Sequence, residues 1–238
     1  MPSQADKAEA HASHLLDAFL GLREKYALLA PMLFDAKVNE LRGSHRQARG
    51  FKTLRMSLFL SCCQEIANLC SDASEKTPSI SKLIAVLSDS DTRRIFEDKY
   101  AEWVVPLVEE EKDPLVLELL RKMEEQERLE RRTQFHDYHA RLESAWLELS
   151  SSSSLKGFSV IRDKVSAHRE LRYVGDKYQV VDISLLGIKW VDLRLTIEKM
   201  QELVELLGLI IRNTGFAWDA LDDQLAITAA DFWSAPTR

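Results

Sequence analysis

Residues 192–212 read DLRLTIEKMQELVELLGLIIR, and they carry the clearest structural pattern in the chain. Large apolar side chains recur there every three or four positions, at Ile197, Met200, Val204, Leu207 and Ile211. This interval matches the 3.6-residue turn of an α-helix, so the pattern predicts a helix with one apolar face. Asp192 is predicted to cap it. An amphipathic helix of this length must bury its apolar face against other elements, which favours a helical bundle.

The same periodicity occurs nearer the N-terminus. A second apolar stripe is predicted on one helical face at Phe51, Leu54, Leu58, Cys62, Ile66 and Leu69. Further helices are predicted at 5–29, within 32–49, from about 114 to 150, at 155–171 and within 216–233. Residues 172–190 are expected to be irregular, with an extended stretch at 178–183. The pattern therefore predicts antiparallel helices packed as a bundle with additional helices.

Proline, glycine and capping residues predict where these helices begin and end. A break or a new helix start is expected at Pro31, and interruptions are expected at Gly43 and Gly50. Two pairs of residues are typical helix starts, with a capping side chain followed by proline: Thr77 with Pro78, and Asp113 with Pro114. Ser90 or Asp91 is expected to cap a short helix after 80–87. The serine run 150–154 is expected to form a loop or a helix junction.

Composition sets the class of protein. The 238 residues include 8 Gly and 6 Pro, fewer than a fold of short strands and turns needs. A hydrophobic content of 45% and a charged content of 29% are ordinary for a globular protein. We expect one helical domain over residues 1–238, with a helical insertion at about 90–150.

Several classes of function lack support. No apolar run approaches the ~20 residues of a membrane helix, and no signal segment precedes the first helix, so we expect a cytoplasmic protein and no membrane partner. Cys62, Cys63 and Cys70 have neither disulfide nor zinc spacing and are expected to pack as small apolar side chains. No nucleotide-loop, zinc-protease or serine-hydrolase motif occurs. A net charge of −6 argues against broad coating of nucleic acid.

Residues 161–170 read IRDKVSAHRE and contain the candidate catalytic residues. Arg162 and Asp163 are adjacent, and His168 follows six positions after the arginine. The order of arginine, polar residue and histidine late in a helical chain resembles the signature of the HEPN superfamily. Residues 68–72, followed by 77–80, add to a resemblance to the abortive-infection U-type HEPN proteins, which covers about residues 10–215.

This resemblance implies a metal-independent endoribonuclease that needs no cofactor and acts as a toxin in antiviral defence. RNA is cleaved when its 2′-hydroxyl attacks the adjacent phosphorus, which needs proton transfer and positive charge on the phosphate. Histidine titrates near neutral pH, and arginine presents a planar fork to phosphate oxygens. His168 would transfer the proton, Arg162 would bind the phosphate, and Asp163 would orient them. Locally basic residues would bind the RNA substrate: Lys164, Arg169 and Arg172.

One geometric difficulty accompanies this assignment. Side chains six positions apart in a regular α-helix point about 120° away from each other. Either the helix is distorted near Arg162, or a second copy of the chain completes the site. The resemblance implies a homodimer whose two motifs face a shared cleft, and a cognate antitoxin protein is a further expected partner.

Alternative interpretations of the same residues stay open. Phe158, Ile161, Val165 and His168 also fit an apolar packing stripe, with Arg162 and Asp163 as a surface pair. The domain would then be a non-catalytic module that binds RNA or nucleotide, or a helical protein-interaction protein that uses the helix at 114–150.

Two other sets of residues attract attention. A basic stripe forms if helix continues through Gly50: Arg42, Arg46, Arg49, Lys52 and Arg55. It is either a phosphate-binding face or an ordinary solvated one. Two histidine pairs have metal-like spacing but no third ligand, and are expected to lie on the surface: His11 with His14, and His136 with His139.

Overall fold

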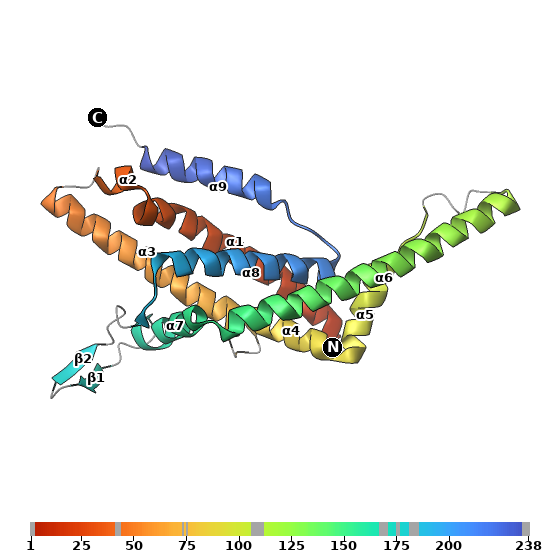
Figure 1. Cartoon of the computed structure of the whole chain (residues 1–238), viewed down its shortest axis with the longest axis horizontal. Helices are drawn as coiled ribbons and strands as arrows, with labels where there is room; N and C mark the ends of the chain where they lie inside the picture. The colour runs from red at the N-terminus through yellow and green to blue at the C-terminus, as the bar shows by residue number, and fades with distance from the viewer. Residues whose placement is uncertain are drawn as a thin grey trace.

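The chain folds into an α-helical bundle with one small hairpin (Figure 1). The computed structural model describes residues 3–40, 44–72, 74, 76–105, 112–166, 171–174, 177–180 and 186–234, with the backbone alone at 166, 171–174 and 177–180. The elements are α1 (Gln4–Phe34), α2 (Ala36–Glu40), α3 (His45–Ser71), α4 (Ile80–Ser88), α5 (Ser90–Ala101), α6 (Pro114–Ser151), α7 (Ser153–Ile161), the π-helical turn η2 (Arg162–Ser166), β1 (Leu171–Val174), β2 (Lys177–Val180), α8 (Trp190–Arg212) and α9 (Trp218–Trp233). The predicted all-α class is confirmed.

The core lies where α8 packs against α1 and α6. The predicted apolar stripe of α8 is confirmed, because Ile197, Met200 and Val204 are all buried. α3 packs on α1 and carries α7 on another side, while α9 lies along α1 (Figure 1). Fully buried phenylalanines join these layers: Phe19, Phe59, Phe135 and Phe158. No helix among the described residues is long and apolar enough to cross a membrane.

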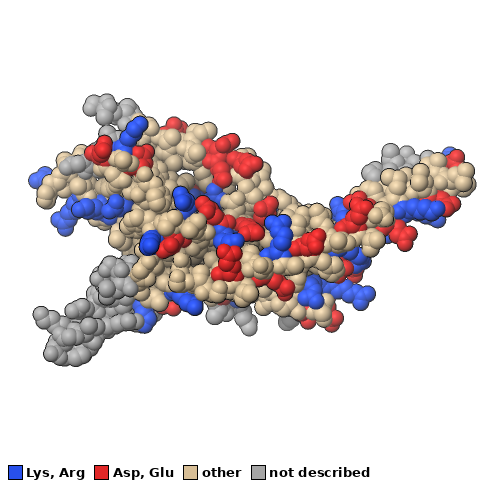
Figure 2. All heavy atoms as spheres, in the orientation of Figure 1, with Lys and Arg blue, Asp and Glu red and all other residues tan. Residues whose placement is uncertain are grey.

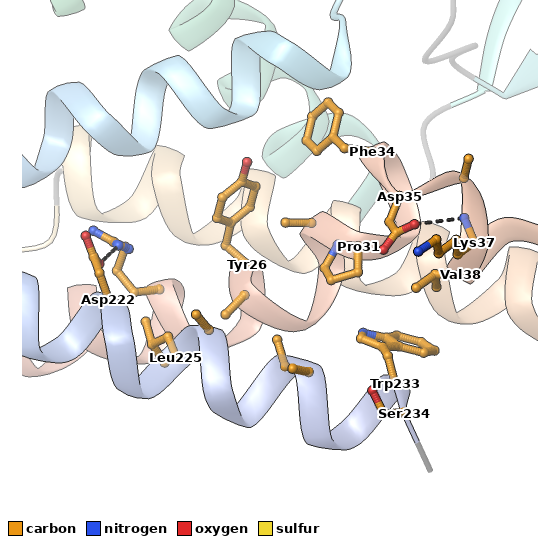
Figure 3. Close-up of a pocket in the computed structure, with 17 residues that line it drawn as sticks. Tyr26, Pro31, Phe34, Asp35, Lys37, Val38, Asp222, Leu225, Trp233 and Ser234 are labelled. Atoms are coloured by element: carbon orange, nitrogen blue, oxygen red, sulfur yellow. Dashed lines mark hydrogen bonds and ion pairs between the residues drawn. The ribbon is translucent and has the colours of Figure 1, made fainter. Parts of the chain in front are cut away.

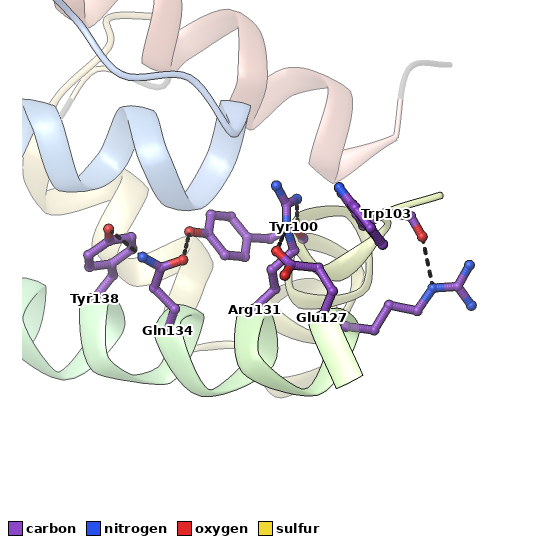
Figure 4. A network of polar contacts seen from close by, with 7 residues as sticks. Tyr100, Trp103, Glu127, Arg131, Gln134 and Tyr138 are labelled. Atoms are coloured by element: carbon purple, nitrogen blue, oxygen red, sulfur yellow. Dashed lines mark hydrogen bonds and ion pairs between the residues drawn. The ribbon is translucent and has the colours of Figure 1, made fainter. Parts of the chain in front are cut away.

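The long helix α6 has two parts with different surroundings. Its C-terminal half contributes Phe135 and Leu142 to the core, whereas its N-terminal half extends away from the body as an arm (Figure 1). Polar bonds tie the end of α5 and the chain after it to this arm (Figure 4): Arg131 Nη1 donates to the Tyr100 carbonyl (3.0 Å), and Arg128 Nε donates to the Trp103 carbonyl (3.1 Å). Segment 90–150 thus supplies both core residues and a projecting arm.

Several predicted boundaries are wrong, for local reasons. Pro31 lies inside α1, which continues for three more residues and closes with the Asp35 N–H on the Pro31 carbonyl (3.0 Å), so the proline removes one hydrogen bond without ending the helix. Gly50 lies inside α3 and does not interrupt it. Leu54 was expected on the buried stripe but is exposed, because the N-terminal half of α3 extends past the core.

Helix starts are predicted correctly where the cap is unambiguous. The Asp113 carboxylate accepts the Leu115 N–H (2.9 Å), with Pro114 in the first turn, as expected. At two other helix starts, a residue near the predicted cap precedes the helix instead. Ser79 precedes α4 in place of Thr77, and Asp89 caps α5 in place of Ser90 or Asp91. α8 begins two residues early, and the Asp192 carboxylate accepts the Lys189 N–H from inside its first turn.

The end of α8 gives a testable prediction. Asn213 adopts left-handed backbone angles (φ 49°, ψ 40°) and is exposed, and the Thr214 N–H closes the helix on the Gly208 carbonyl (3.3 Å). Asn213→Val is expected to destabilise the fold by about 1–2 kcal/mol, because a β-branched side chain clashes in this conformation, whereas Asn213→Gly should be neutral or stabilising. Thermal unfolding measures both. An equal effect from the control Gln224→Val, at an exposed site within α9, would contradict the conformational explanation.

Candidate functional site

The helix that precedes the motif is fixed by packing on two sides. Ser152 Oγ accepts the Leu155 N–H (3.2 Å) and starts α7. Phe158 and Ile161 are fully buried, and α7 packs on α3. On another side Gly157 allows close approach, because a Cβ there would lie 2.7 Å from the Ile188 side chain. The position of the motif is therefore set by the core.

The helix changes character where the motif begins. The Arg162 N–H points at two carbonyls, of Phe158 and Ser159, and residues Arg162–Ser166 form the π-helical turn η2. Such turns are rare and are frequently found at functional sites. The predicted helix to residue 171 is wrong, because β1 begins at Leu171. A distortion of the helix near Arg162, one of the two expected remedies, is thus present.

The Arg162 side chain is held by two contacts. Its Nε donates to Asp163 Oδ1 (2.7 Å), and its Nη1 donates to the carbonyl oxygen of Ala67 (3.3 Å). Ala67 lies near the C-terminal end of α3, where the helix dipole favours a cation. The Arg162 side chain is 23% exposed, and its Nη2 group makes no hydrogen bond to the described residues. This leaves an oriented guanidinium edge at the surface.

The Ala67 contact joins two segments that the sequence suggested separately. Residues 68–72 follow Ala67 directly, and the motif begins at Arg162. The Asp163 carboxylate is 56% exposed and reaches the guanidinium from the adjacent position. Asp163 therefore contacts Arg162 as expected of an orienting residue.

Of the remaining predicted site residues, the structure describes two and leaves two undescribed. Lys164 is half-buried in η2. Arg172 lies on β1 opposite Gln179 of β2, in the antiparallel hairpin that follows the motif. His168 and Arg169 lie outside the described residues, so the placement of the histidine relative to Arg162 stays a prediction. The extended stretch expected at 178–183 is partly observed, as the end of β2.

The packing interpretation of the motif is correct for its first members. Phe158 and Ile161 are buried, and Val165 packs partly buried against the core. Arg162 lies off that stripe and reaches α3. The described apolar residues of the segment therefore anchor it, while the Arg162 side chain is 23% exposed and that of Asp163 is 56% exposed.

The cysteines and histidines do not form a second site among the described residues. Burial raises the pKa of Cys62 and of Cys70 to about 12 and raises that of Cys63 as well, so all three stay protonated and pack as predicted. In the described ranges no group of three His, Cys, Asp or Glu side chains is placed to hold a metal ion. The prediction that His139 lies on the surface is wrong. Its side chain is only 12% exposed, and burial lowers its pKa despite the nearby Glu143.

The basic stripe exists along the unbroken helix α3. Arg46, Arg49 and Lys52 are exposed, while Arg42 lies outside the described residues. The Arg55 guanidinium is half-buried, 5.9 Å from the Phe51 ring centre and 6.0 Å from that of Trp190. Figure 2 shows positive side chains gathered at the end of the molecule where α3 begins.

Sequence reasoning missed one pocket. A space of about 910 Å³ lies between α1, α2 and α9 (Figure 3), within the size range of ligand sites. Alanines on the facing helices leave the space open, and the ion pair of Arg23 with Asp222 lies at one end. The motif residues do not line it. The sequence signal that could have indicated this pocket is the set of alanines at helical spacing in α1 and α9.

Comparison with known proteins confirms the family resemblance. The HEPN family model AbiU2 matches residues 5–232, nearly the whole chain. Neither the curated proteins nor the solved structures gave a significant match.

Proposed function

The chain belongs to the HEPN AbiU2 family, and we propose that it is a metal-independent endoribonuclease acting in abortive-infection defence. One observation carries the proposal. Arg162 begins a π-helical turn and is oriented by Asp163 and by the Ala67 carbonyl, and its Nη2 group bonds none of the residues that the structure describes. An arginine held in this way can bind an anionic oxygen without losing further side-chain freedom.

The proposed reaction uses groups of this chain and of the RNA. The 2′-hydroxyl attacks the adjacent phosphorus as its proton is removed, the bond from phosphorus to the 5′-oxygen breaks, and that oxygen takes a proton. Arg162 stabilises the negative charge that builds on the phosphate. His168 transfers a proton, and Asp163 keeps the guanidinium in place. The products are a 2′,3′-cyclic phosphate and a 5′-hydroxyl end.

Binding of the RNA is proposed to extend beyond these three residues. Lys164, Arg169 and Arg172 follow in the motif and the hairpin, and would contact phosphates near the cleaved bond. A homodimer would bring two motifs to one cleft, and a cognate antitoxin would silence it. A monomer with full activity at all protein concentrations would contradict the dimer.

The test incubates purified protein with total RNA and with transfer RNA in EDTA, beside the double variant Arg162→Ala/His168→Ala. We expect the wild type to cleave RNA and to leave 2′,3′-cyclic phosphate ends, and the double variant to be inactive. Circular dichroism checks that the variant remains folded.

Each outcome separates the alternatives. Cleavage by both proteins would place the activity elsewhere or in a contaminant. RNA binding without cleavage, at every concentration and with phage-infected extract added, would assign a binding module. Absence of both would favour a protein-interaction role for the arm of α6, which exposes Leu115, Leu119, Met123 and Leu129.

A further inference from the structure

The N-terminal part of α3 carries positive charge without compensation. Residues 45–64 include four Arg and Lys residues and neither Asp nor Glu, in a chain whose net charge is −6. Among the described residues none of these four side chains forms an ion pair with a carboxylate, whereas Arg23, Arg132 and Lys199 all do. Uncompensated cations on one helix repel each other, so this arrangement fits a polyanionic ligand.

These cations lie in line with the candidate site. Arg49 precedes Ala67 by eighteen residues, which is five full turns, so both lie on one side of α3 about 27 Å apart. Arg46 and Lys52 lie about 60° to either side of Arg49. Because the buried Ala67 accepts a hydrogen bond from Arg162 through its carbonyl, this side of α3 runs from the exposed cations toward the motif.

An exposed aromatic ring borders the same face. Trp190 is 36% exposed and is held by the Phe59 ring, with centroids 4.8 Å apart and the planes perpendicular. Lys52 precedes Phe59 by seven residues, or about two turns, so it lies on the same side of α3. Arg55 packs against Trp190 between them. A ring fixed in this way offers a stacking surface beside the cations.

We propose that single-stranded RNA binds along this basic face, made by Arg46, Arg49 and Lys52 and bordered by Trp190, and is thereby led to Arg162. The inference rests on the proposed nuclease function, whose substrate it places on the surface. The cations bind successive phosphates regardless of sequence. Unpaired bases stack on Trp190, which a duplex does not allow, and this selects single strands.

An anionic membrane is the competing ligand. Leu54 and Met56 are exposed beside the cations, and basic helices with apolar side chains also bind lipid headgroups. The direction of the basic face favours RNA, because a nuclease substrate must reach Arg162, whereas lipid phosphates could bind these cations without reaching it.

The experiment measures binding in a His168→Ala background, so that the RNA is not consumed. Fluorescence anisotropy follows a labelled single-stranded RNA of about 12 nucleotides over a series of salt concentrations. The test variant is Arg46→Gln/Arg49→Gln/Lys52→Gln. The matched control, Lys7→Gln/Arg94→Gln/Arg121→Gln, removes three exposed cations from α1, α5 and α6. Thermal unfolding confirms that both triple variants are folded.

The test variant is expected to bind about 10- to 100-fold more weakly, with the slope of log affinity against log salt reduced by about 2, as three lost phosphate contacts require. The control should bind like the parent. Trp190→Leu is expected to weaken binding by about 5- to 100-fold without changing the slope, because stacking releases no counterions.

Other results would overturn the inference. These are equal losses in both triple variants, no loss in either, or absence of binding to single-stranded RNA. Loss of binding to phosphatidylserine vesicles with RNA binding intact would assign the face to a membrane. The two proposals fail separately: a protein that binds RNA through this face but never cleaves it refutes the nuclease alone. Cleavage with an unchanged KM, when the three test substitutions are made in the chain that retains His168, refutes the basic face alone.

Discussion

Replacing Arg162 with lysine is expected to reduce RNA cleavage by at least about 100-fold while leaving the fold intact. The guanidinium of Arg162 bonds Asp163 through Nε and the Ala67 carbonyl through Nη1 at the same time. Its planar fork fixes the direction of the remaining N–H groups. A lysine ammonium keeps the charge but is a flexible point charge, so it cannot hold both partners and a phosphate in one geometry.

Single-turnover cleavage of a defined RNA measures this effect. The control is Lys156→Ala, which removes an exposed cation from α7, six residues before Arg162. It should retain nearly full activity, because only the number of charges changes. Comparable activity in Arg162→Lys and the wild type would show that position 162 supplies charge alone. The two contacts that orient Arg162 would then no longer support the proposed site.

Truncating Phe19 to alanine is expected to lower the free energy of unfolding by about 3–5 kcal/mol. Phe19 is fully buried on α1, with its ring 5.9 Å from that of Trp218 in an edge-to-face arrangement. Its removal loses apolar burial and leaves a cavity that the surrounding helices cannot close. Native domains are stable by only about 5–15 kcal/mol, so this single change takes a large part of the total.

Phe34→Ala is the matched control on the same helix. Phe34 is 48% exposed and contacts the Arg194 guanidinium, 5.7 Å from the ring centre. Its loss should cost less than about 1 kcal/mol. Urea unfolding followed by circular dichroism compares the two variants. Equal losses would contradict the burial that places Phe19 in the core.

Local patterns predicted most of the helices and the faces they bury. The stripe in α8 is buried as expected, because a 3.6-residue periodicity is a property of the segment itself. Errors occurred at the ends, where neighbouring residues compete for one role. Thr77 and Ser79 are both residue types that cap helices, and α4 begins after Ser79, whose hydroxyl donates to the Asp72 carbonyl (3.3 Å).

The sequence could predict which residues belong to the candidate site, but not most of their arrangement. The spacing of Arg162, Asp163 and His168 identified the segment, and the contact of Asp163 with Arg162 follows from adjacency. The apolar periodicity could not predict the π-helical turn, because residues 155–165 also fit a regular α-helix. The hairpin was predicted only as an extended stretch, since its pairing depends on the backbone between the strands.

The sequence by itself determined the helical class, the apolar faces, the motif and the charge of α3, because each is a property of residues close together in the chain. Tertiary structure alone decided that the Ala67 carbonyl receives Arg162 from 95 residues away, and that Trp190 packs beside Arg55. Such contacts depend on how whole helices cross. The crossing is set by the packing of many side chains at once, which no local pattern encodes.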